Sequence, residues 1–117
     1  MKFKFKEEKT FEQRKEENEV VSKEHPSKIA IICEKAPNAK LIEIPKTKYL
    51  VDKTVNSSQF YTTIKNHLKI DEKEAIFLLV NGKFTLSQNE SMGDIYNKFK
   101  DKDGFLYIAY TSEEIWG

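Results

Sequence analysis

The sequence predicts an α+β fold in which a four-stranded mixed sheet packs one face against a helix. Short runs of β-branched and aromatic residues alternate with segments in which apolar residues recur every three or four positions. An Asn-Gly pair follows one apolar run, and this dipeptide favours the tight turn of a hairpin. The 117 residues fit a single domain, which would bury roughly 65% of the unfolded chain's surface on folding.

The composition indicates a globular chain that works in a reducing compartment. Hydrophobic residues make up 38% of it, and no apolar run approaches the roughly 20 residues of a membrane span. The start MKFKFKEEK lacks the apolar stretch of a secretory signal, so we expect a cytoplasmic protein. A single cysteine, Cys33, cannot form an internal disulfide and is expected in the core. The 20 basic and 19 acidic residues nearly balance, so no nucleic-acid partner is expected.

A mostly solvated helix is expected over residues 11–24, near the start of the chain. Thr10 followed by Gln13 resembles a capping box, which marks the first turn of a helix. The helix should end before Pro26, because the residue preceding a proline disfavours helical geometry. With few apolar residues, this helix should cover the second face of the sheet through a small number of contacts.

Two strands and a helix come next. Residues 28–35 are apolar at both odd and even positions, which is typical of a central strand covered on both faces. Residues 41–51 are predicted to form a broken strand, and its last part, KTKYLV, has the alternation of an edge strand. Asn56 or Ser57 can cap a helix that reaches about Lys69 and turns its apolar side to the core.

The remaining elements complete the sheet. Residues 75–80 are predicted to form another buried strand, and the Asn-Gly turn leads into a short strand at 83–85. Ser91 can cap a short amphipathic helix, and residues 105–110 form the last strand. After the first helix, this order is that of the ubiquitin-like β-grasp, since two hairpins are local and the last strand pairs through a crossover.

The chain is expected to be one compact domain with three parts. These are an N-terminal helical subdomain with two helices at residues 1–26, the β-grasp at 27–112 and a C-terminal tail at 113–117. Charge is unevenly distributed: residues 29–70 carry 7 basic and 3 acidic residues, and residues 71–117 carry 5 and 9. A basic middle therefore precedes an acidic final third.

No catalytic, metal or cofactor site is predicted, so the chain is not expected to be an enzyme. His25 and His67 lie far apart and have no Cys or carboxylate at metal-ligand spacing, and no Gly-rich phosphate loop is present. The tail is the exception. Gly117 has no Cβ, so its carboxylate can enter the narrow enzyme sites in which a carboxylate is adenylated and passed to thiols. Trp116 either helps processing enzymes to recognise the tail or packs on the domain.

Several segments carry a family resemblance: MKFKFKEEKTFEQR, HPSKIAIICEKAP, KTKYLV, SSQFYTTIK, FLLVNGK, SMGDIY and KDKDGFLYIAY. From end to end, the chain resembles the ubiquitin-like autophagy modifiers of the GABARAP and light-chain-3 group. The resemblance implies that an E1-like and an E2-like enzyme join Gly117 to phosphatidylethanolamine, and that a cysteine protease processes and releases the modifier. It also implies an autophagosomal membrane location once the chain is lipidated.

The resemblance further implies a docking site for autophagy receptors. Their short aromatic-x-x-aliphatic motifs would add as a strand to the edge of KTKYLV, and acidic residues before the aromatic would meet Lys28, Lys46 and Lys48. The family match assigns Glu17, Val21, Ala30, Ile32, Lys48 and Leu50 to an aromatic pocket, and Tyr49, Val51, Val55, Phe60, Thr63 and Ile64 to an aliphatic pocket.

Some positions depart from the family pattern. Asp52 stands where proline often follows the docking strand, and Thr63, where leucine is common, should weaken the aliphatic pocket. Gly104 replaces an aromatic of animal members and is expected to widen the aromatic pocket. The Trp-Gly ending resembles that of a sister modifier joined to a protein. Two alternatives therefore stay open, namely a protein-conjugated modifier and a non-conjugated trafficking or microtubule adaptor.

Overall fold

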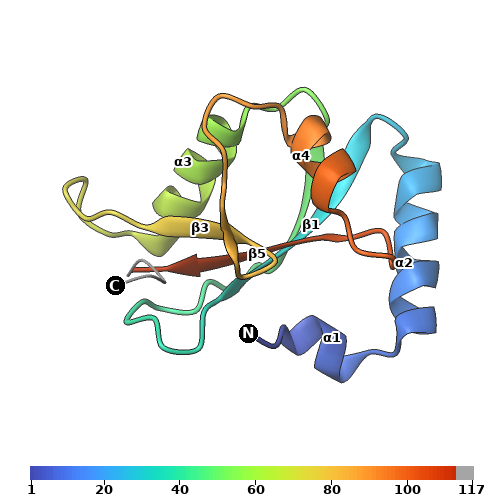
Figure 1. Cartoon of the computed structure of the whole chain (residues 1–117), viewed down its shortest axis with the longest axis horizontal. Coiled ribbons are helices and arrows are strands. Elements are labelled where there is room, and N and C mark those ends of the chain that lie inside the picture. Colours follow the sequence, from blue (N-terminus) through green and yellow to red (C-terminus); the bar gives the residue numbers. More distant parts are fainter. Residues whose placement is uncertain (113–117) are drawn as a thin grey trace.

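A computed structural model of the chain describes residues 1–112 (Figure 1). The predicted conjugation residue Gly117 and the adjacent Trp116 lie outside the described residues. The sheet has five strands in the order β2-β1-β5-β3-β4, and β1 pairs parallel with β5 but antiparallel with β2. The elements are α1 (Lys4–Glu8), α2 (Phe11–Glu24), β1 (Lys28–Lys35), β2 (Lys48–Asp52), α3 (Ser57–Leu68), β3 (Phe77–Val80), β4 (Phe84–Thr85), α4 (Met92–Phe99) and β5 (Leu106–Thr111).

The α+β class and the mixed sheet are confirmed, but the predicted number of four strands is wrong. Asn81 and Gly82 have φ angles of 57° and 71°, as the predicted tight turn requires. The turn returns the chain so that Phe84 pairs with Val80. The predicted hairpin therefore forms, and its short second strand, β4, is the fifth strand of the sheet.

Three strands are shorter than predicted, and in two of them, β2 and β3, a tyrosine hydroxyl takes the place of a ladder bond. Of the broken strand expected at 41–51, only β2 forms, and it extends one residue further. The N–H of Ile44 donates instead to the hydroxyl of Tyr110, at 3.0 Å. β3 likewise starts two residues late, since the Tyr61 hydroxyl donates to the carbonyl of Ile76 at 3.0 Å.

The helices begin where the capping signals place them. The Thr10 hydroxyl accepts from the Gln13 N–H at 3.2 Å, and the Gln13 side chain accepts from the Thr10 N–H at 2.9 Å. Asn56, rather than Ser57, caps α3 and forms a second capping box. Ser91 caps α4 as predicted.

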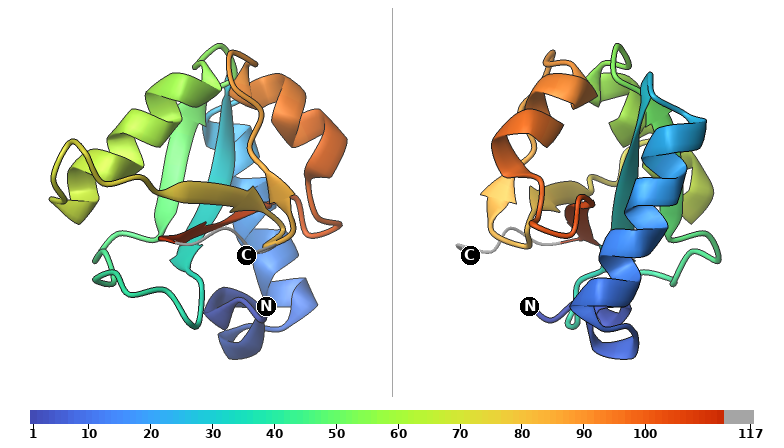
Figure 2. Two further views of the ribbon diagram at one scale, coloured as in Figure 1. Left: turned by 60° about the vertical axis from the view of Figure 1, so that its left-hand side comes forward. Right: turned by 90° about the vertical axis from the view of Figure 1, so that its right-hand side faces the viewer.

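Hydrophobic side chains fill both faces of the sheet. Successive residues of β1 point to opposite faces, which explains its apolar character at every position. Ile31 and Cys33 pack on the α3 side, and burial raises the pKa of the Cys33 thiol, as befits a core residue. Ala30 and Ile32 pack on the opposite side with Phe5 of α1. Figure 2 (left) shows α2 behind β1 and β2, so the N-terminal helices cover the second face.

No helix within residues 1–112 combines the length and apolar character needed to cross a membrane.

Candidate functional site

β2 lies at one edge of the sheet, and its outer side is open. Among the described strands it pairs only with β1. The flanking residues Thr47 and Lys53 form main-chain bonds toward β1 at 2.8 Å and 3.1 Å, so the odd-numbered residues turn their backbone groups inward. The N–H and C=O groups of Lys48 and Leu50 therefore point to the open side. A further strand can pair there.

The first hollow is a cavity of about 200 Å³ between this edge and α2. It lies on the sheet face that α1 and α2 cover. Ile32, expected in the aromatic pocket, is fully buried beneath it and does not line it, whereas the other five expected residues do. The lining comprises Glu17, Val21, Ala30, Ile31, Lys48, Tyr49, Leu50 and Phe105.

The second hollow is a cavity of about 310 Å³ between the same edge and α3, on the opposite face of the sheet. Ile64 is fully buried in the core and does not reach it, whereas the other five residues of the expected aliphatic pocket line it. Tyr49 and Leu50 line both hollows. The lining comprises Lys28, Tyr49, Leu50, Val51, Asp52, Val55, Gln59, Phe60 and Thr63.

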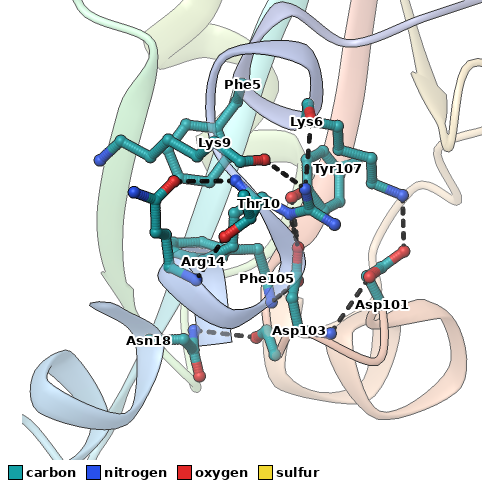
Figure 3. Close-up of polar contacts among 12 residues, drawn as sticks. Phe5, Lys6, Lys9, Thr10, Arg14, Asn18, Asp101, Asp103, Phe105 and Tyr107 are labelled. Atoms are coloured by element: carbon teal, nitrogen blue, oxygen red, sulfur yellow. Dashed lines mark hydrogen bonds and ion pairs between the residues drawn. The ribbon is translucent and has the colours of Figure 1, made fainter. Parts of the chain in front are cut away.

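Buried polar contacts hold α2 in place as a wall of the first hollow (Figure 3). Arg14 Nε donates to Asp103 Oδ2 at 2.8 Å, and the Asp103 side chain is completely buried. That carboxylate also accepts from the Tyr107 hydroxyl at 2.5 Å and from the Phe105 N–H at 2.8 Å. The contact therefore ties α2 to the segment from which Phe105 enters the hollow.

Gly104 lets α2 approach the start of β5. The Asn18 side-chain amide donates to the Gly104 carbonyl at 3.0 Å. A Cβ on residue 104 would lie 2.2 Å from Asn18 Oδ1, and the φ of +95° is one that L side chains rarely adopt. Gly104 is not among the residues that line the first hollow, and the expected widening of the aromatic pocket stays a prediction.

Glu17 joins two lysines at the first hollow. Its Oε1 accepts from Lys48 Nζ at 2.8 Å and from Lys9 Nζ at 2.9 Å. Its Oε2 is buried and has no hydrogen-bond partner within residues 1–112. Burial favours a raised pKa, but the hydrogen bonds from Lys48 and Lys9 prevail and lower the pKa of the Glu17 carboxyl. Glu17 is therefore an anion with one unused acceptor.

The three lysines expected to meet acidic residues differ in their surroundings. Lys48 is engaged with Glu17, whereas the exposed Lys46 places its ammonium 5.0 Å from the ring centroid of Tyr49. Lys28 lines the second hollow and forms no ion pair with any residue of the described part of the chain. Of these three lysines, Lys46 and Lys28 have no carboxylate partner within residues 1–112.

Sequence reasoning missed four lining residues, namely Ile31, Asp52, Gln59 and Phe105. Helical spacing could have found Gln59, because it lies one turn before Thr63 on α3. Thr63 itself donates its hydroxyl to the Gln59 carbonyl at 3.0 Å, so its polar atom is already satisfied. Nothing local marks Phe105, which comes from the far end of the chain.

A third hollow of about 490 Å³ lies between α3 and the β3–β4 hairpin, and none of the expected peptide-binding residues lines it. Within residues 1–112, no group of three or more His, Cys, Asp or Glu side chains is arranged to hold a metal ion.

Comparison with known protein families gives one match. Residues 13–117 match the model of a family described as "Autophagy protein Atg8 ubiquitin like". The match covers α2 from its third residue onward, the whole sheet, both hollows and the C-terminal tail.

Proposed function

Because the chain belongs to the Atg8 family of ubiquitin-like autophagy proteins, we propose that it is a lipid-conjugated modifier that recruits receptors to autophagic membranes. In this proposal, Gly117 is joined to phosphatidylethanolamine, and the open edge of β2 binds aromatic-x-x-aliphatic peptides. The chain acts as an adaptor and not as an enzyme.

The observation that carries the docking proposal is the position of the two hollows on opposite faces of one open strand. In an added strand, successive side chains point to alternate faces. The aromatic and the aliphatic residue are three positions apart, so they point to opposite faces. One peptide strand can therefore place its aromatic side chain in the first hollow and its aliphatic side chain in the second.

The order of the hollows along β2 also gives the direction of the peptide. The first hollow includes Lys48 at the start of β2, and the second includes Val51 and Asp52 at its end. The peptide should therefore run parallel to β2. Acidic residues before the aromatic then lie near Lys46, which precedes the strand and has no carboxylate partner in the described chain.

The unused oxygen of Glu17 favours tryptophan as the aromatic anchor. Glu17 lines the first hollow, and its buried Oε2 lacks a donor within residues 1–112. An indole N–H supplies a donor on an apolar ring, whereas phenylalanine does not. A charge-assisted bond of this kind would relieve the cost of leaving a buried acceptor unpaired.

Affinity for a single peptide should be on the order of micromolar. Burying two anchors gains roughly 3 to 6 kcal/mol, and ordering the peptide offsets several of these. Attachment of many modifier copies to one membrane compensates through avidity. Conjugation and docking therefore depend on each other in the proposed function.

The proposed conjugation proceeds through the carboxylate of Gly117. It attacks the α-phosphorus of ATP and releases pyrophosphate, and a cysteine thiol of the E1-like enzyme then displaces AMP to give a thioester. A cysteine thiol of the E2-like enzyme takes over the acyl group and frees the E1 thiol. The amine of phosphatidylethanolamine then attacks the thioester carbon, forming an amide and releasing the thiol. Support comes from the family match, which extends to residue 117.

A reconstitution assay tests this reaction. The chain is incubated with ATP, the cognate E1-like and E2-like enzymes and phosphatidylethanolamine liposomes, and we expect a small, phospholipase-sensitive mobility shift. The Gly117→Ala variant should give little adduct, because its methyl group obstructs the narrow transfer sites. Equal conjugation of the two proteins would contradict the proposed role of Gly117.

The Trp-Gly ending motivates a second candidate, a modifier joined to a protein. An immunoblot of cells expressing the chain separates the two. A discrete band heavier by a whole partner protein supports protein conjugation. Membrane recruitment that does not depend on Gly117 would instead support a non-conjugated adaptor.

A further inference from the structure

Asp52 presents a free carboxylate at the end of the open strand. It is exposed and forms no hydrogen bond through its side chain and no ion pair with any other residue in 1–112. Its carbonyl accepts from the Val55 N–H at 3.0 Å, which ends the edge available for pairing. Asp52 therefore lies where an added strand would leave β2.

Lys28 lies directly across the sheet from Asp52, but within residues 1–112 it does not neutralise this carboxylate through an ion pair. Asp52 is directly opposite Lys28 in the β1–β2 register, so their side chains share one face. Neither side chain has an ion-pair partner among the described residues. The Asp52 carboxylate thus remains available to a third group.

The register identifies which peptide residue reaches Asp52. This step rests on the proposed docking of an aromatic-x-x-aliphatic peptide parallel to β2. Asp52 has the same parity as Lys48 and Leu50, so its side chain lies on the α2 side of the sheet. The aliphatic anchor points to the α3 side, and the next peptide residue points back to the α2 side, at the level of Asp52.

We propose that Asp52 selects a basic residue immediately after the aliphatic anchor. The preferred partner is then a peptide with acidic residues before the aromatic, which meet Lys46, and a lysine or arginine after the aliphatic. Lys28 opposes this preference from the same face, so removing its charge should strengthen the selection. Charge at the two ends of the motif thereby sets which receptors bind.

Titration calorimetry with three peptides tests the proposal. The peptides share an aromatic-x-x-aliphatic core and carry Lys, Ala or Glu directly after the aliphatic. For an exposed charge contact we expect the Lys peptide to bind about fivefold more tightly than the Glu peptide. Asp52→Asn should abolish this preference, and Asp52→Lys should reverse it. Glu74→Gln, which removes an exposed acid before β3, should leave it unchanged.

Two outcomes would overturn the selection by Asp52. One is equal affinity of the wild-type chain for the Lys and Glu peptides, and the other is a preference that persists in Asp52→Asn. Failure of all three peptides to bind the wild-type chain would instead contradict the docking function itself. A genuine charge contact should also weaken between 50 mM and 500 mM salt, because added ions screen exposed charges.

Discussion

Lys48 Nζ lies 2.8 Å from Glu17 Oε1, and this ion pair joins β2 to α2 across the first hollow. The same oxygen accepts from Lys9 Nζ at 2.9 Å. One carboxylate therefore holds two ammonium groups, and a net positive charge remains. An acidic residue of an incoming peptide can bind one lysine while the other keeps Glu17 paired.

Removing two side chains from β2 should abolish peptide binding. Leu50 lines both hollows and Lys48 lines the first, so Lys48→Ala combined with Leu50→Ala removes apolar and charged contacts together. Titration calorimetry should show affinity lowered at least about 30-fold. Val20→Ala provides a control, because Val20 is 55% exposed on α2 and lines neither hollow. Unchanged affinity of the double variant would place the binding site elsewhere.

Glu17 should determine a preference for tryptophan over phenylalanine. Its Oε2 is buried without a donor in the described chain, and only the indole can donate to it. Glu17→Ala should lower the ratio of tryptophan-peptide to phenylalanine-peptide affinity about fivefold, as expected for one lost hydrogen bond. The matched variant Glu16→Ala, at the exposed neighbouring position, should preserve the ratio. An unaltered ratio in Glu17→Ala would refute this role.

Breaking the buried pair of Arg14 and Asp103 should destabilise the fold. Arg14→Ala leaves a fully buried carboxylate without its cation, and the free energy of unfolding should fall by about 3 kcal/mol. Urea denaturation followed by circular dichroism measures this change. Glu43→Gln breaks an exposed pair with Lys4, whose side chains are 63% and 67% exposed, and should cost less than about 1 kcal/mol. Similar losses of unfolding free energy in Arg14→Ala and Glu43→Gln would contradict the larger contribution expected of the buried pair.

Gly104→Ala should be destabilised by at least about 2 kcal/mol for two separable reasons. The new methyl group would lie 2.2 Å from Asn18 Oδ1, and the φ of +95° is unfavourable for alanine. Adding Asn18→Ala removes the clash but not the strained φ. The double variant should therefore recover part of the loss attributed to Gly104→Ala in urea denaturation. An additive loss would show that the contact with Asn18 is not limiting.

Acid should weaken the contribution of Glu17 to stability. The pKa of Glu17 is lower in the folded chain than its ordinary value, because hydrogen bonds from Lys48 and Lys9 outweigh burial. The folded state therefore binds that proton less tightly than the unfolded state, so the stabilisation is present above the ordinary pKa and is lost as pH falls below it. Between pH 7 and pH 3.5, the free energy of unfolding should fall less in Glu17→Gln than in the wild-type chain. The difference between the two losses should be less than about 1 kcal/mol.

Local signals predicted which helices and strands form better than they predicted the residues at which these begin and end. The capping pairs at Thr10 and Asn56 and the Asn81-Gly82 turn act within a few residues, so the sequence alone identifies them. The broken strand was mispredicted because the Tyr110 hydroxyl, distant in sequence, takes the N–H of Ile44 out of the ladder. No periodicity in residues 41–51 reveals that bond.

The same distinction applies to the candidate site. The family resemblance identified most lining residues, but it also included Ile32 and Ile64, which are buried behind the hollows. It omitted Phe105, whose place in the first hollow depends on how α2 packs against β5. It also gave Asp52 no role, because a free carboxylate at a strand end is apparent only from the register and the absence of partners in residues 1–112.

The attachment of α2 to Asp103 sets the order in which the binding surface can form during synthesis. α2 is translated well before its buried anchor Asp103 and before β5. The first hollow cannot be complete on the ribosome until residues 103–111 have emerged, so unfinished chains should not bind receptors prematurely. Peptide binding at the first hollow would thus report that synthesis has passed residue 111.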